Sequence, residues 1–185
     1  MTDTGYVLSD AQQAQMLRKL MLFWDGQWFL KTAEAFGLEP AIDLNARVRA
    51  SFGRIEMRTL LKVLRKRHAD DLADALRLLM TYTQAFMGDG LSATVALTGA
   101  DCAEITIWHC AAYEGAKRAN LPRADQACVA CETVWNAWLE TLLPDAGVDV
   151  QYSLRQGKGD PRCLFLIQIH NQGGEWCQPN PLPKP

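Results

Sequence analysis

Six cysteines and three histidines carry much of the reactive chemistry of this 185-residue chain. His109 and Cys110 are adjacent, and an imidazole beside a thiol can act as the general base for a thiolate nucleophile. Neighbouring strand residues point to opposite faces, so a working pair requires the chain to turn between them. A helix that begins at Cys110 would supply the turn and lower the pKa of the thiol. The alternative is a strand-end histidine next to a buried thiol.

Cys128 and Cys131 form a C-x-x-C pair, which can supply two metal ligands or a reactive thiol. The pair falls inside an expected amphipathic helix and shares a face with Trp135. This position favours a small core residue for Cys128, and it leaves core and site equally open for Cys131. The alternative metal set is Cys110, Cys131 and Cys163, with His109 or Cys128 as the fourth ligand.

Two further stretches combine residue types found at ligand sites. Trp24, Asp25 and Trp28 place a carboxylate among aromatic side chains, which would mark a ligand pocket if Asp25 were buried. A solvent-exposed Asp25 on an amphipathic helix is an equal alternative. The glycine-rich segment 157–160 joins two strand-like runs and is not followed by a helix, so it predicts a hairpin turn rather than a phosphate loop.

The apolar periodicity predicts the elements that must position these residues. A helix is expected from Ser9 or Asp10 to Gly37, buried on more than one side because its apolar residues exceed one stripe. Another helix fits residues 40–51, with Gly53 as a break, and a helical region of one or two helices fits 55–87. The later elements are two strands (91–98 and 102–108), a short helix from Cys110, a helix (124–143) and two strands (148–154 and 163–169).

This order predicts an α+β fold, in which N-terminal helices precede two β-hairpins that form an antiparallel sheet covered by a long helix. We expect a single domain over residues 1–185. Its helical part spans 9–87, its α+β part spans 88–171, and a disordered tail spans 178–185. Cys110, Cys131 and Cys163 are then expected to converge on one place.

Composition limits the classes of partner. With 19 basic and 21 acidic residues the chain has no overall basic charge, which argues against a nucleic-acid partner. It has no apolar run near the ~18–20 residues of a membrane span and no secretory signal. Cysteines without such a signal predict reduced thiols and a cytoplasmic location. A small molecule is the expected partner, while a cofactor and self-association as a homo-oligomer are left open.

The C-terminal motifs resemble a known family. Trp108-His109-Cys110, Cys131-Glu132 and the segment 157–165 are similar to the L-2-amino-thiazoline-4-carboxylic acid hydrolase-like family and to the related small-molecule-binding domains named after 4-vinyl reductase. These families share a cysteine after a strand, a second one in the next helix, and a G-D-x-x-C-x-F hairpin. The matching residues are Cys110, Cys131, Gly159, Asp160, Cys163 and Phe165.

The N-terminal part, residues 23–37 and 53–58, is similar to an uncharacterised bacterial and archaeal family, a domain of unknown function. One departure concerns the hydrolase-like proteins, which usually carry an acidic residue three or four positions after the helical cysteine. Val134 and Trp135 occupy those positions here. The departure weakens the hydrolytic expectation.

The resemblance implies two alternative functions. In the first, a cysteine-dependent C–N hydrolase acts on a small heterocyclic or amide-like substrate, with Cys110 as nucleophile, His109 or Glu132 as proton carrier and Cys163 in the pocket wall. In the second, a non-catalytic 4-vinyl reductase-like module holds an apolar ligand or cofactor. Its pocket would lie between the sheet and the helix that carries Trp24 and Trp28. The residues leave open whether the protein is catalytic.

Overall fold

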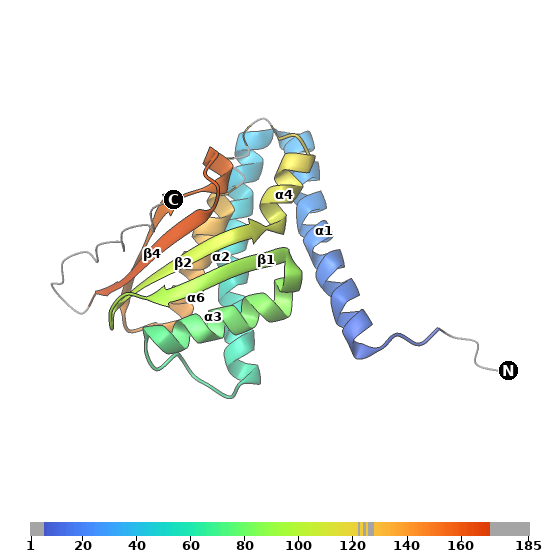
Figure 1. Cartoon of the computed structure of the whole chain (residues 1–185). Coiled ribbons are helices and arrows are strands. Elements are labelled where there is room, and N and C mark those ends of the chain that lie inside the picture. Colours follow the sequence, from blue (N-terminus) through green and yellow to red (C-terminus); the bar gives the residue numbers. More distant parts are fainter. Residues whose placement is uncertain (1–5, 122, 124, 126–127, 171–185) are drawn as a thin grey trace.

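The computed structural model describes residues 6–121, 123, 125 and 128–170. It confirms an α+β fold with N-terminal helices followed by strands (Figure 1). The described helices are α1 (Asp10–Phe36), α2 (Leu38–Val63), α3 (Leu72–Met87), α4 (Ala111–Arg118) and α6 (Val129–Leu142), with short 3-10 turns η1 (Gly88–Gly90) and η2 (Gln156–Lys158). The strands are β1 (Leu91–Leu97), β2 (Cys102–Cys110), β3 (Gly147–Leu154) and β4 (Cys163–His170).

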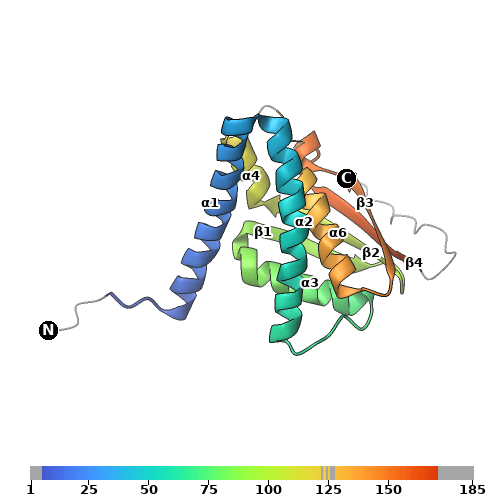
Figure 2. The ribbon, with the colours of Figure 1, turned by 180° about the vertical axis from the view of Figure 1, so that it is seen from behind.

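The four strands form one antiparallel sheet in the order β1-β2-β4-β3, so that both hairpins pair as expected and β4 joins them. Helices α6 and α2 lie on the same side of the sheet, and α3 runs alongside the edge strand β1 (Figures 1 and 2). Alternate residues of β4, among them Phe165, Ile167 and Ile169, join one core cluster with side chains of α2, α3 and α6. The predicted tail, residues 178–185, lies outside the described residues.

The predicted start and end of α1 agree with the structure. Ser9 forms a capping box, in which its side chain accepts a bond from the Gln12 amide and the Gln12 side chain accepts one from the Ser9 amide. Gly37 follows the helix with a φ of 93°, a conformation that favours glycine. The expectation that α1 is buried on more than one side is wrong, because Phe29 is its only fully buried residue among those described.

Gly53 does not break the chain, as the sequence suggested, but lies inside α2. A Cβ at this position would come within 2.9 Å of Val134 Cγ2 and 3.3 Å of the Trp138 ring, both on α6. The glycine therefore permits a close approach between two helices. Helix α2 ends at Val63, and α3 starts after Asp71, whose carboxylate accepts a bond from the Asp74 amide. Residues 40–87, expected as one helix followed by a region of one or two helices, thus form two helices, α2 and α3.

A buried carboxylate lies at the same helix contact. Glu56 on α2 is 6% exposed, and its Oε2 accepts a hydrogen bond of 2.6 Å from Trp138 Nε1 on α6. Arg49 Nη1 lies 3.7 Å from the other carboxylate oxygen. A buried charge is costly unless it is paired and hydrogen-bonded, so Arg49 on α2 offsets the charge of Glu56, and the Trp138 bond ties α6 to α2 at a defined position.

The described part of the chain contains no helix with both the length and the apolar character needed to cross a membrane.

Replacing Gly53 with alanine is expected to destabilise the protein by roughly 1–3 kcal/mol, because the added methyl group overpacks the contact between α2 and α6. Gly26→Ala is the matched control, since a Cβ added there would have no neighbour within 4 Å and alanine favours a helix over glycine by about 1 kcal/mol. Urea denaturation of both variants measures the difference. Equal stability of Gly53→Ala and wild type would contradict the close approach.

Trp138→Phe keeps most of the aromatic volume but removes the indole donor to Glu56. We expect a loss of about 1–3 kcal/mol, because the buried carboxylate loses a hydrogen bond. In the double variant with Glu56→Leu the acceptor is absent as well, so the further cost of Trp138→Phe should be much smaller. Chemical denaturation of the two single variants and the double variant measures this coupling, and strictly additive losses would argue against it.

Candidate functional site

Four free cysteines gather at one end of the sheet. Cys110 ends β2, Cys163 begins β4 opposite Ile107 of β2, and Cys128 and Cys131 lie at the start of α6. Cys110, Cys131 and Cys163 pack against the same core cluster. Cys110 and Cys163 both contribute to the raised pKa values of Cys128 and Cys131, so the four thiols lie within electrostatic range of one another. The fold therefore brings together the three sulfurs that the sequence singled out, and it adds Cys128.

Burial raises the pKa of each of these thiols. It raises the pKa of Cys131 well above its ordinary value, and that of Cys128 to about 11. For Cys110 the effect of burial outweighs the lowering by the backbone amides of Tyr113 and Ala112 at the start of α4. Burial also raises the pKa of Cys163, against a hydrogen bond from the Gln156 amide. The start of α4 therefore acts to lower the Cys110 pKa, as expected, but burial outweighs this effect, and the net shift is upward for all four thiols.

His109 does not share the environment of Cys110. It is exposed, whereas Cys110 contacts the core. Both residues belong to β2. The pairing of β2 with β1 shifts register at Trp108, the residue before His109. A helix does begin at Ala111, but the groups that act on the Cys110 thiol are amides of α4 and the Glu114 carboxylate. The predicted His109–Cys110 pair gains no support from this geometry.

Glu132, the other predicted proton carrier, is held by a cation. Its Oε1 lies 2.5 Å from Arg155 Nη1, and both side chains are about a quarter exposed. The backbone oxygen of Glu132 accepts a 2.8 Å bond from the Tyr152 hydroxyl, which fixes the start of α6 against β3. The carboxylate is thus engaged in an ion pair beside the thiols.

Gln156 contributes a polar group that the sequence did not indicate. The residue is 9% exposed; its amide N–H donates to Cys163 Sγ at 3.4 Å and its Nε2 to the backbone oxygen of Trp108 at 3.2 Å. Its Oε1 is buried and has no hydrogen-bond partner among the described residues. Because the bond to a backbone oxygen requires the amide nitrogen there, the free atom is the oxygen. A buried acceptor therefore lies beside the thiol cluster.

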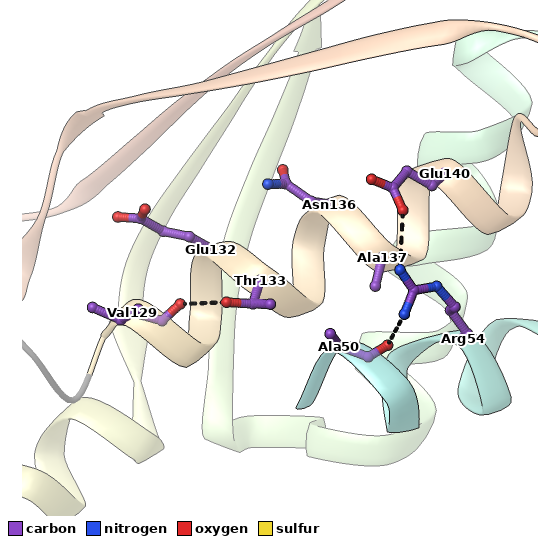
Figure 3. A pocket seen from close by; sticks show the side chains of 8 residues that line it. All are labelled: Ala50, Arg54, Val129, Glu132, Thr133, Asn136, Ala137 and Glu140. Atoms are coloured by element: carbon purple, nitrogen blue, oxygen red, sulfur yellow. Dashed lines mark hydrogen bonds and ion pairs between the residues drawn. The ribbon is translucent and has the colours of Figure 1, made fainter. Parts of the chain in front are cut away.

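A polar groove lies between α2 and α6. Its volume is about 290 Å³, and it is lined by Ala50, Arg54, Val129, Glu132, Thr133, Asn136, Ala137 and Glu140. Figure 3 shows Arg54 reaching from α2 toward Glu140, 3.5 Å away, and toward the Ala50 oxygen, 3.3 Å away. No cysteine lines this groove. Arg54 and Glu140 pair with each other across the groove, and Glu132 pairs with Arg155 outside it.

Trp24, Asp25 and Trp28 lie on α1. Trp24 is 68% exposed and Trp28 is 41% exposed, and Asp25 is exposed as well. The prediction of a pocket between these tryptophans and the sheet gains no support, since the side chains of Trp24 and Trp28 are exposed. The solvent-exposed alternative for Asp25 is the one the structure shows.

The remaining sequence interpretations concern metal binding, the turn and the redox state. Among the described residues no three His, Cys, Asp or Glu side chains are arranged to hold a metal ion, so the alternative metal set gains no geometric support there. Segment 157–160 is a turn, with Gly159 at a φ of 96°.

Cys102 is disulfide-bonded. The expectation of reduced thiols throughout the chain is wrong at this position.

The raised thiol pKa values predict slow alkylation of the native protein. For Cys128 the rate should rise about tenfold per pH unit from pH 7 until it levels off near its pKa of about 11, because the thiolate is the reacting form. Peptide mass spectrometry after timed iodoacetamide treatment measures each site. Urea-unfolded protein is the control, and its thiols should level off near their ordinary pKa of about 8.5. Rapid native labelling of Cys110 at pH 7 would contradict this account.

Comparison with known proteins supports the fold. No family model and no curated protein matches the chain, so the hydrolase-like and 4-vinyl reductase-like resemblance stays a prediction. One similar structure is trafficking protein particle complex subunit 3 from Naegleria fowleri, covalently bound to palmitic acid (TM-score 0.59, 12% identity, 89% of this chain and 99% of that chain). Another is the phenol-responsive sensory domain of the transcription activator PoxR with phenol (TM-score 0.49, 14% identity, covering 80% of this chain and 74% of that chain). The first shares this chain's α+β fold.

Proposed function

We propose that this protein is a non-catalytic binding module for a small, mainly apolar molecule that carries a hydrogen-bond donor. The observation that carries the proposal is the Gln156 Oε1 atom, a buried acceptor without a partner among the described residues. A buried amide oxygen left unpaired costs about 1–3 kcal/mol. A ligand hydroxyl or N–H group would recover that cost and would fix the orientation of the ligand.

The thiol cluster supplies the apolar part of the site. Protonated cysteines behave as small polarizable hydrophobes with weak S–H donors. Four of them meet between the ends of β2 and β4, the start of α6 and the η2 turn. Such a surface suits an apolar ligand body, with the polar atom of Gln156 at one side, as in ordinary small-molecule sites.

Two further observations support binding over catalysis. The thiols are held in the protonated form, which is a poor nucleophile. The carboxylate nearest in sequence to Cys131, that of Glu132, is ion-paired with Arg155. In addition, a protein of the same fold binds palmitic acid, so the architecture can accommodate an apolar ligand.

A cysteine-dependent C–N hydrolase is the second candidate. One observation favours it: the amides of Ala112 and Tyr113 donate to the Cys110 sulfur at the start of α4, and such amides stabilise a thiolate. In that function Cys110 would attack the substrate carbonyl carbon and the amine would leave with a proton. Water would then release the acyl group.

The binding proposal predicts a preference for ligands with a donor. Displacement of a fluorescent apolar dye should show that 1-decanol binds wild type about three- to tenfold more tightly than its methyl ether, as one neutral hydrogen bond would give. Gln156→Leu removes the acceptor at similar volume and should abolish this preference. Lys158→Leu in the same turn is exposed and serves as the control.

Circular dichroism and thermal unfolding of the variants establish that they are folded. Cys110→Ala should keep the preference for the alcohol. Equal binding of alcohol and ether by wild type would refute the role of Gln156. Turnover of an amide substrate that is lost in Cys110→Ala would establish the hydrolase instead.

A further inference from the structure

Helix α1 exposes a continuous apolar stripe. Seven large apolar side chains between 40% and 68% exposed lie on it: Met16, Leu17, Leu20, Met21, Phe23, Trp24 and Trp28. Leu17, Leu20, Trp24 and Trp28 recur at spacings of three and four, which places them on one face of the helix. Exposed apolar residues are ordinary when scattered, but a contiguous set of this kind marks an interaction site.

The side of α1 that contacts the rest of the molecule is a different one. Its less exposed residues include Ala14, Arg18, Leu22, Phe29 and Ala33, also at helical spacing. Arg18 Nε donates to the Ala85 oxygen at 2.7 Å, and Phe29 packs with Ala41 and Ile42 of α2. Toward its N-terminus α1 diverges from α2 in both views (Figures 1 and 2). Packing among residues 6–121, 123, 125 and 128–170 therefore leaves the apolar stripe without a partner.

The stripe is large enough for a stable interface. At their exposed fractions, Phe23, Trp24 and Trp28 alone present on the order of 350 Å², given the ~150–250 Å² that an aromatic side chain can bury. The four aliphatic side chains are about half exposed and add a comparable area. The sum exceeds the ~300–600 Å² of the largest patch on a typical monomer and approaches the ~800 Å² per partner of a standard interface.

The charges of α1 favour a second copy over a charged partner. The helix carries three acidic residues and three basic ones, so it has no net charge. An anionic lipid surface is usually bound by a helix with a basic polar face, and a charged protein partner would require the opposite sign. A second copy has the same neutral, apolar surface, and a two-fold axis lets both stripes be covered in one contact.

We propose that two copies of this protein associate through α1, with the apolar stripe of one helix packed against the same stripe of the other about a two-fold axis. The contact removes Trp24 and its neighbours from water, which is the main source of its stability. It does not depend on the ligand site, because the thiol cluster lies at the sheet and not on α1.

Analytical ultracentrifugation of the full chain tests the proposal. At concentrations of about 1–50 µM, where a dimer of this kind should form, wild type should sediment at twice its 20.6 kDa mass. Trp24→Glu places a charge in the interface and should weaken association at least about 100-fold, giving a monomer. Val63→Glu on α2 changes a side chain that is 73% exposed but off the stripe, and it should remain a dimer.

Leu20→Lys provides a second disruption with a charge of opposite sign. Unchanged far-UV circular dichroism in both variants excludes unfolding as the cause. A wild type that is monomeric at 50 µM, or a Trp24→Glu variant that is still dimeric, would overturn the proposal. Binding of monomeric wild type to phosphatidylcholine vesicles, lost in Trp24→Glu, would assign the stripe to a lipid surface and overturn it as well.

Discussion

The contact between α2 and α6 at Gly53 positions the rest of the structure. Without a side chain at Gly53, Val134 and Trp138 approach the α2 backbone, and the Trp138 indole reaches the buried Glu56 carboxylate. This bond specifies where α6 lies along α2, since a shift of the helix would leave a buried charge unpaired. Helix α6 in turn covers the sheet, where Trp135 packs edge-on against Phe165 at 5.4 Å between ring centres.

The position of α6 determines the chemistry of the thiols. It brings Cys131 over the ends of β2 and β4, where burial keeps the thiol protonated. The same burial that assembles four cysteines also makes them poor nucleophiles. The carboxylate of Glu132 is ion-paired with Arg155, and in the described part of the chain Gln156 Oε1 is a buried acceptor with neither a hydrogen bond nor an ion pair. We therefore propose that these weak donors and this acceptor hold a ligand rather than transform it.

Much of the fold could be predicted from local sequence patterns. The errors concern features that are set by packing between segments distant in the sequence. The alternation of β4 and the Ser9 cap are local signals, so the last hairpin and the start of α1 were predictable. Gly53 was misread because a helix break and a close helix approach look the same in sequence. The outward side of α1 and the raised pKa of Cys110 depend on packing between distant segments. The sequence did not predict that Gln156 is buried, because a glutamine in a turn is ordinarily exposed.

A crystal structure of the protein purified without added ligand tests the binding account most directly. The account predicts electron density from a bound small molecule that places a donor atom at hydrogen-bond distance, about 2.7–3.2 Å, from Gln156 Oε1. The body of that molecule should lie against the sulfurs of Cys110, Cys131 and Cys163. A site in which Oε1 is bonded by a protein group, with those three sulfurs packed directly together, would contradict the account.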